Sequence, residues 1–488
     1  EKTARRTPLL ANDMHLPYSA PNIWHRVELC YESTRVSGIA VPGIPVVVAG
    51  SNGILAWGMT NVPGDLTELV PFESLDGPVM VRTREERIVV SRSQTRMKVL
   101  HDCRWGPVLP QSVCGQRVAL EWSALWPASV HLGLSRLIEA TSLDEAITIA
   151  HEGGCPPLNI HFAHRNEGIA HTVAGLIPLR LGRRLQYGKF VPANRLPCAR
   201  NPESGYLITV NDPPLVEPDN VEPGWNYPGA YRRSRLEECL ALRDDWNEAD
   251  TISLARDNRS GFYDFYHELA LAIVESAAAL GWQDRQRNDL KTALLAWDGC
   301  FGRESRGIAV LCVLRRRLLG HMFSYYLKAC AQIDPEFQYT WRNPEPPLRQ
   351  LLSQRPATIV PEPSRYKDWE DYLAGTLAAV CDSLENRMRR SVAEITWGDF
   401  QKVQFLHPFG NSIVGRILSL PSLPSDGGDE CVAAVGTNRG PTQRMAVSPG
   451  WELGGLFEMP GGQSSSPWSS HFRDHHRAWI RQSPVPLR

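Results

Sequence analysis

VPGIPVVVAGSNGILAWGMTNVPGDLTEL, residues 41 to 69, is the stretch that decides the fold. Short runs of β-branched, aromatic and other apolar residues begin at positions 44, 54 and 66, and glycine, proline and asparagine separate them. Runs of this length between turn-forming residues favour consecutive β-strands over helices. The stretch therefore predicts neighbouring strands of one sheet.

Similar patterns extend outward from this stretch. Further strands are predicted at 23–32, 35–41, 80–90 and 116–125. A helical pattern follows at 135–153, in which Ser142 is expected to be the N-cap and Glu145 lies three residues on. Residues 159–175 then predict a β-hairpin, with Asn166-Glu167-Gly168 as its turn.

The region 245–390 has a different character. Apolar residues recur at helical spacing in three long segments, at 262–280, 310–330 and 368–390. Glycine, proline and strand signals return after them. The sequence therefore predicts an N-terminal part of a β-rich core at 1–244, a mainly helical insertion at 245–390, and a C-terminal part of the core at 391–488.

Composition excludes several classes of partner. The formal net charge is −1, and 22% of the residues are charged, so the chain lacks the basic surplus of a nucleic-acid-binding protein. Proline interrupts the most apolar stretch, IAVPGIPVVVAG, well before the roughly 20 residues that a membrane helix needs. The 11 cysteines include no C-x-x-C pair, which argues against a zinc ribbon or a thioredoxin-type redox site.

Common catalytic signatures are also missing. The sequence contains no G-x-S-x-G, H-E-x-x-H, Walker A loop or dinucleotide fingerprint. An α/β-hydrolase, a zinc protease and an NTPase are therefore disfavoured. What remains is a set of polar residues at positions typical of strand ends: Asn12, Asp13, His15, Asn61, Asn159, Asn211 and Arg232. Taken singly, an asparagine after a strand is usually a turn former, and a lone histidine is usually structural.

Five motifs, in order, change this interpretation. They are PLLANDMHL (8–16), the opening stretch (41–69), NPESGYLITVND (201–212), PGAYRRSRLEECL (228–240) and MPGGQSSSPWSSHFRDHHRAWIRQSPVPL (459–487). Together they resemble the β-subunit of the penicillin acylase family of N-terminal-nucleophile hydrolases, which includes penicillin, cephalosporin and acyl-homoserine-lactone acylases. The resemblance implies an α+β fold, a four-layer αββα sandwich, interrupted here by the helical insertion.

The resemblance also implies a reaction and its setting. The expected function is hydrolysis of the amide bond of an N-acyl small molecule through an acyl-enzyme, by a heterodimer with an α-subunit from the same precursor. The compartment implied is periplasmic or secreted. The nucleophile would be an N-terminal serine just upstream of Glu1, whose own α-amine acts as base. Because the sequence starts at Glu1, we expect a processed subunit or a fragment. The alternative is a non-catalytic binding homologue that keeps the scaffold without a nucleophile.

The family's site residues can be matched one by one. Asn61 matches the residue whose backbone N–H forms half of the oxyanion hole, and Asn211 matches the one whose side-chain amide forms the other half. Arg232 matches the arginine that orients the nucleophile and Asn211. His15 matches a position near the nucleophile, where a positioning role is expected.

Three further positions match the acyl-binding site. Leu16, Ala49 and Met59 stand where the phenylacetyl-specific enzymes have two aromatic residues and a serine. The resemblance therefore implies an aliphatic acyl group, as in acyl-homoserine lactones or penicillin-type substrates. The alternative is that the α-subunit reshapes the pocket and these residues decide little.

The sequence GDLTEL matches a calcium site of the penicillin acylases. Asp65, the Thr67 carbonyl and Glu68 would supply oxygen ligands, which suit Ca²⁺, with a further ligand from the α-subunit. A solvated acidic turn is the alternative. No organic cofactor, nucleic acid or membrane span is expected.

Overall fold

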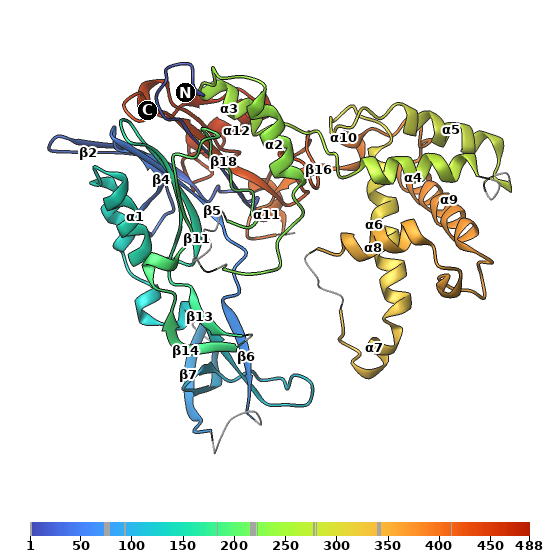
Figure 1. The fold of residues 1–488 in the computed structure, drawn as a ribbon, viewed down its shortest axis with the longest axis horizontal. Coiled ribbons are helices and arrows are strands. Elements are labelled where there is room, and N and C mark those ends of the chain that lie inside the picture. Colours follow the sequence, from blue (N-terminus) through green and yellow to red (C-terminus); the bar gives the residue numbers. More distant parts are fainter. Residues whose placement is uncertain are drawn as a thin grey trace.

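The computed structural model of the chain describes residues 2–72, 79–91, 94–182, 184–214, 221, 223–276, 279, 281–338, 343–410 and 412–488. In the part of the molecule on the left of Figure 1, two antiparallel sheets pack face to face, with helices on their outer faces.

The larger sheet has seven strands in the order β15-β12-β11-β5-β4-β3-β2. In that order the strands are Cys198–Arg200, Gly168–Ala174, Leu158–His164, Leu55–Asn61, Val47–Ser51, Thr34–Ala40 and His25–Tyr31. The predicted strands at 23–32 and 35–41 and the hairpin at 159–175 are confirmed. Between β4 and β5 the Asn52 Oδ1 accepts the N–H groups of Ile54 and Leu55, at 3.0 and 2.9 Å, which closes the turn that the sequence predicted.

The smaller sheet has the order β1-β18-β19-β20. Its strands are Leu10–Pro17, Arg439–Val447, Leu456–Glu458 and Val485–Pro486. β1 and β18 pair antiparallel although they come from opposite ends of the chain. Both sheets contribute to one buried apolar layer, which includes Leu10, Met445, Val447 and Phe457 from the smaller sheet and Ile39, Ala49, Ala56 and Ala163 from the larger. This shared core holds the sheets together.

Helices form the two outer layers. α1 (Leu143–Glu152) packs its apolar side, including Leu143 and Ile147, against Trp57 and Phe162 of the larger sheet. On the other side, α3 (Glu248–Leu254) contacts β1, β18 and β19, and α12 (Asp474–Ile480) contacts β19. Helix, sheet, sheet and helix thus follow one another, which confirms the predicted αββα sandwich of the α+β class.

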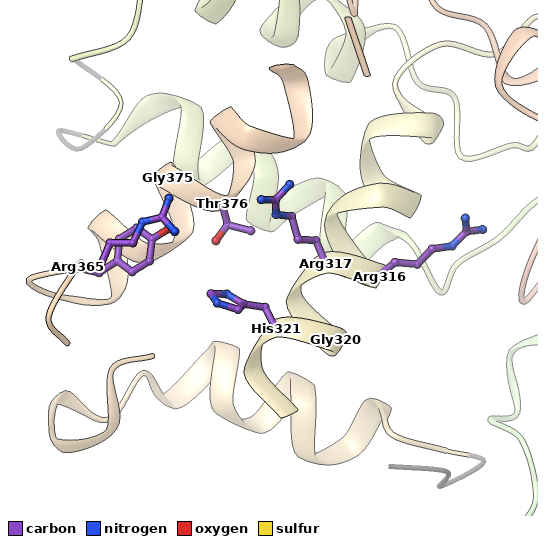
Figure 2. Close-up of a pocket in the computed structure, with 8 residues that line it drawn as sticks. Arg316, Arg317, Gly320, His321, Arg365, Gly375 and Thr376 are labelled. Carbon is purple, nitrogen blue, oxygen red and sulfur yellow. The ribbon is translucent and has the colours of Figure 1, made fainter. Parts of the chain in front are cut away.

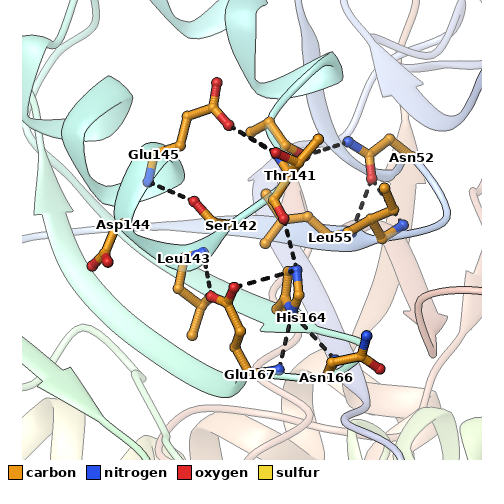
Figure 3. Close-up of polar contacts among 12 residues, drawn as sticks. Asn52, Leu55, Thr141, Ser142, Leu143, Asp144, Glu145, His164, Asn166 and Glu167 are labelled. Atoms are coloured by element: carbon orange, nitrogen blue, oxygen red, sulfur yellow. Dashed lines mark hydrogen bonds and ion pairs between the residues drawn. The ribbon is translucent and has the colours of Figure 1, made fainter.

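The start of α1 follows the predicted capping pattern. The Ser142 side chain accepts the backbone N–H of Glu145 at 3.2 Å, and the Glu145 carboxylate accepts the N–H of Thr141 at 2.9 Å (Figure 3). Below this cap, His164 Nδ1 accepts the N–H of Glu167 at 3.0 Å within the hairpin turn, which lies at 165–167, one residue earlier than predicted. The Glu167 carboxylate in turn accepts the N–H of Leu143 at 2.8 Å. The cap and the turn therefore support each other.

A helical unit lies to one side of the sandwich (right in Figure 1) and has its own apolar core. Its helices are α4 Asp264–Glu275, α5 Asp284–Leu295, α6 Ile308–Tyr326, α7 Lys328–Ile333, α8 Glu345–Gln354 and α9 Trp369–Met388. The three long helical segments of the sequence fall on α4, on α6 with α7, and on α9. The predicted domain boundaries at 244/245 and 390/391 remain a prediction. α3 lies inside the predicted insertion, 245–390, but packs on the sandwich. Ile395 and Trp397, beyond 390, belong to the helical core.

The remaining strands extend from the sandwich as small sheets. β6 pairs with β10, β13 with β14, β16 with β17, and β7 with β8 and β9. Their bounds, with those of the last helices, are β6 Thr67–Pro71, β7 Arg82–Ser91, β8 Gln94–Cys103, β9 Gly106–Pro107, β10 Val118–Trp122, β13 Pro178–Leu181, β14 Arg184–Phe190, β16 Lys402–Phe405, β17 Leu420–Pro424, α2 Tyr231–Ala241, α10 Trp397–Phe400 and α11 Ile413–Leu418. In the described part of the chain, no helix combines the length and apolar character needed to span a membrane.

Candidate active site

Three of the four predicted catalytic residues meet at the end of β5. Asn61 is the last residue of that strand, and its carbonyl accepts a hydrogen bond from Asn211 Nδ2 at 3.0 Å. Arg232, in the first turn of α2, donates from Nη2 to Asn211 Oδ1 at 3.1 Å and also to the Val210 carbonyl. The arginine thus fixes which way the Asn211 amide faces, with its NH₂ group towards Asn61.

Asn159, which the sequence singled out without a role, holds the same strand end from the other side. It is fully buried on β11, and its Nδ2 donates to the Asn61 carbonyl at 3.3 Å. Its Oδ1 hydrogen-bonds with Nε2 of His171 at 3.0 Å. Two side-chain amides therefore converge on one carbonyl and immobilise the end of β5.

Sequence reasoning missed the polar network behind this strand end. His161 Nε2 and Thr209 Oγ1 are 2.9 Å apart, and Thr209 Oγ1 also bonds with Thr60 Oγ1 at 2.9 Å. His161 and His171 are directly opposite in the β11–β12 pairing, with ring centroids 4.8 Å apart. The observed turn lies at 165–167, one residue before the predicted Asn166-Glu167-Gly168. The predicted turn would have placed His161 opposite Val173, so the sequence pattern could not bring the two histidines together.

Both histidines are kept neutral. Burial lowers the pKa of His171 to about 4, against the opposing charge of Asp212. Burial, with His171 and Arg233 close by, holds the pKa of His161 well below its ordinary value. Neutral rings can accept or donate hydrogen bonds without bringing a second charge beside Arg233, which pairs with Asp212.

His15, the fourth predicted residue, belongs to a different set of contacts. Its Nε2 lies 3.2 Å from Asp13 Oδ1, and Asp13 Oδ2 accepts from Arg444 Nε at 3.0 Å. Arg444 also lies 3.5 Å from Glu458, which pairs with Arg256. Burial alone would raise the pKa of Asp13, but the charges and hydrogen bonds of His15 and Arg444 outweigh it and leave that pKa below its ordinary value. His15 is thus held at the edge of a buried chain of alternating charges.

The three predicted acyl-site residues are all on strands of the sandwich. Ala49 is buried in the core between the sheets, and Leu16 packs against that core. Met59 is buried in the neighbouring core beneath α1. Because side chains alternate along β5, Met59 points to the opposite face of the larger sheet from Ala56, which belongs to the same core as Ala49. The structure therefore does not bring the three predicted acyl-site residues together.

Two of the three predicted calcium ligands, Asp65 and Glu68, lie beside an arginine, whereas Thr67 pairs with Trp122 in the β6–β10 sheet. Asp65 pairs with Arg180 on β13, and Glu68 lies 3.8 Å from the same guanidinium. Burial raises the pKa of Asp65 and of nearby Glu121. Among the residues that the structure describes, no group of three or more His, Cys, Asp or Glu is arranged to hold a metal ion. Calcium therefore stays a prediction, and the position of Arg180 does not fit it.

A cavity of about 260 Å³ lies in the helical unit (Figure 2). Its lining includes Arg316, Arg317, His321, Arg365 and Thr376, from α6, α9 and the segment before α9. None of the predicted site residues lines it. His321 pairs with Glu362 at 2.8 Å, and Arg316 points away from the other side chains in Figure 2. The charged groups do not converge on one ligand position.

Comparison with known proteins places the chain in a family. The family model described as penicillin amidase matches residues 1–488. The chain is 24% identical to an acyl-homoserine lactone acylase QuiP of Pseudomonas aeruginosa, over 97% of this chain and 64% of that protein. It is 22% identical to the penicillin acylase 2 proenzyme of Pseudomonas sp. (strain SE83), over 100% and 65%. The chain thus spans just under two thirds of the length of these relatives.

A solved structure agrees with the sequence comparison. The fold matches a thermostable penicillin G acylase from Alcaligenes faecalis with a TM-score of 0.71 and 16% sequence identity, covering 98% of this chain and 93% of that one. Since the family model covers every residue of the chain, the chain belongs to the penicillin amidase family.

Proposed function

We propose that the complete protein hydrolyses the amide bond of an N-acyl small molecule through an acyl-enzyme. Membership of the penicillin amidase family and relatives named as acyl-homoserine lactone and penicillin acylases support this reaction class. The observation that carries the proposal is the Asn211 side chain, which Arg232 orients beside Asn61 at the end of β5.

The proposed chemistry uses a serine just upstream of Glu1. Its free α-amine, with an ordinary pKa of roughly 7.7 to 8.0, takes the hydroxyl proton as the oxygen attacks the substrate carbonyl. The negative charge on that carbonyl oxygen is then stabilised by the Asn61 backbone N–H and the Asn211 side-chain amide. The C–N bond of the substrate then breaks, and the substrate's amine leaves with the proton that the α-amine had taken, so the acyl group stays on the serine oxygen as an ester. Water, losing a proton to the α-amine, attacks this ester, and the acyl group leaves as a carboxylic acid while the serine regains its proton.

The remaining residues position these groups. Arg232 keeps the Asn211 oxygen occupied, so the NH₂ group faces Asn61. One amide hydrogen is bonded to the Asn61 carbonyl, and the second is assigned to the oxyanion. His15, fixed by Asp13, is assigned a positioning role at the nucleophile. Leu16, Ala49 and Met59 are assigned to the acyl pocket, which favours an aliphatic chain. An α-subunit from the same precursor and a periplasmic or secreted location complete the proposal.

The test starts from the full-length gene product. N-terminal sequencing of its chains should find a new N-terminal serine just upstream of Glu1, and the protein should release free amine from an N-acyl amide. Replacing that serine by alanine should abolish both processing and turnover. Finding no serine, threonine or cysteine there would favour the non-catalytic binding homologue.

A further inference from the structure

Three acidic side chains gather where β6, β10 and β13 meet. Glu68 and Glu121 are directly opposite in the antiparallel β6–β10 pair, and Asp65 lies just before β6. Glu121 is 6% exposed, and the Asp65 and Glu68 side chains are 22% and 25% exposed. Like charges directly across a sheet destabilise it, and partial burial strengthens the repulsion because water screens it less. This cluster needs a cation.

Arg180 supplies a positive charge at this place. Its guanidinium pairs with the Asp65 carboxylate, donates from Nη2 to the Asp65 carbonyl at 3.3 Å, and lies 3.8 Å from Glu68. The side chain is only 18% exposed. A planar guanidinium with several donors suits a site with more than one oxygen acceptor.

The same contacts join several separate segments. The Glu68 carboxylate accepts the N–H of Leu185 on β14 at 2.6 Å, and the N–H of Asp65 donates to the Pro223 carbonyl at 2.8 Å. The Arg180 guanidinium also lies 5.5 Å from the centre of the Trp225 ring. The Arg180 cluster, comprising Asp65, Glu68, Glu121 and Arg180, therefore links β6, β13 and β14 to the segment at 223–225.

We propose that Arg180 is a built-in cation that replaces a bound Ca²⁺ in this cluster and makes the protein's stability independent of calcium. A calcium ion takes six to eight oxygen ligands at roughly 2.3–2.6 Å. Here the Asp65 carboxylate and carbonyl are both bound by the guanidinium, and a Glu68 oxygen is bound by a backbone N–H. A Ca²⁺ on these oxygens would lie within a few ångströms of the guanidinium, where the two positive charges repel.

The first experiment measures the melting temperature of the full-length wild-type protein in excess EDTA and in millimolar CaCl₂. The two values should agree, and calorimetric titration with CaCl₂ should detect no binding at this cluster. A Tm that falls in EDTA and recovers with calcium, in a manner abolished by Asp65→Asn, would overturn the proposal.

The second experiment removes the cation. Arg180→Gln should lower the Tm by roughly 5 °C, because it leaves partly buried carboxylates without a partner. Added CaCl₂ should restore part of that loss, because the freed oxygens can then bind the ion. A lowered Tm that calcium does not raise would contradict the equivalence of the two cations, and an unchanged Tm would contradict the role of Arg180.

Two further variants serve as controls. Arg180→Lys keeps the positive charge, so added calcium should not change the Tm of this variant. That Tm is expected to be lower than the wild type's only by what the loss of the planar guanidinium costs. Arg35→Gln removes an exposed guanidinium that pairs with Glu28 at 2.9 Å on the surface. It should change the Tm little and confer no calcium response. A calcium response in either control would count against the proposal.

Discussion

Asn211 combines an unusual backbone with a fixed side chain. Its φ of 67° lies in the left-handed region, which asparagine tolerates better than most residues. Its amide is held between Arg232 and the Asn61 carbonyl. The residue type therefore satisfies a local conformational need as well as the proposed oxyanion role, and an experiment must separate the two.

Substitutions of Asn211 by glycine and by alanine make that separation. Both remove the amide, but only Asn211→Gly accepts the positive φ without strain. In the complete enzyme both should lower kcat about a hundredfold or more. Both also lose the two side-chain hydrogen bonds of Asn211, but Asn211→Ala should lower the unfolding free energy by about 1 kcal/mol more than Asn211→Gly does. Steady-state kinetics and urea unfolding measure the two effects, with the exposed Asn288→Ala as control. A glycine variant with near-normal kcat would refute the oxyanion assignment.

His171 gives a prediction about pH at the same scale. Its pKa is lowered to about 4 in the folded state, against an ordinary value of 6.5. Between those values the unfolded chain binds more protons, so stability falls as the pH drops from about 6.5 towards 4. His171→Gln removes this pH-dependent contribution to stability. Between pH 7 and pH 5 the unfolding free energy of the variant should therefore fall by about 2 kcal/mol less than that of the wild type. Urea unfolding of both proteins at both pH values checks this, with the exposed Asn288→Ala as control.

The sequence predicted some site residues and missed others for a physical reason. Asn61 and Asn211 could be proposed as site residues because they stand in linear motifs whose order could be compared with a family, and the structure places them within hydrogen-bond distance of each other. The position of Arg180 beside Asp65 and Glu68 could not be predicted, because these partners are more than a hundred residues away from it in the chain. Contacts of that kind depend on how small sheets pack, which no local pattern records.

Elements were predictable where their signals are local. The run at 54–60 became β5 (Leu55–Asn61) shifted by one residue, and Ser142 caps α1 as its sequence indicates. β1 was harder, because the polar residues Asn12 and Asp13 suggested a strand end, whereas they lie inside β1 (Leu10–Pro17). In the structure these residues bond across the sheet to Gln443 and Arg444 of β18, at 2.7 and 3.0 Å. Only the pairing of distant strands explains such polar residues in a core strand.

The cap of α1 can be tested directly. Ser142→Ala removes the acceptor for the Glu145 N–H and should lower the unfolding free energy by about 1 kcal/mol. Ser142→Asp keeps an acceptor at the N-cap and adds a favourable charge at the helix N-terminus, so it should retain wild-type stability. Urea unfolding of the three proteins decides the matter. Equal losses in both variants would mean that the cap hydrogen bond contributes nothing.

At the scale of the whole molecule, the site depends on both sheets. β1 of the smaller sheet carries His15 and Leu16, whereas β4 and β5 of the larger sheet carry Ala49, Met59 and Asn61. Asn12 Nδ2 donates to the Met59 carbonyl at 2.9 Å and so ties β1 to β5. The shared core and this bond fix the spacing between the two sheets on which the proposed site residues lie.

Acyl-chain preference is the prediction that follows for the complete enzyme. Leu16, Ala49 and Met59 offer aliphatic or thioether surface and no aromatic ring, so a phenyl group would lack the edge-to-face partners that favour it. Each added methylene that becomes buried should contribute about 0.8 kcal/mol and raise kcat/KM by up to about fourfold until the pocket is full. The measurement compares kcat/KM for N-acyl amides of increasing chain length with the phenylacetyl amide of the same amine. Ala49→Phe should shorten the preferred chain, whereas Ile23→Phe, at an exposed position before β2, should leave the preference unchanged. A clear preference for phenylacetyl, or no trend with chain length, would show that residues outside this chain decide the acyl specificity.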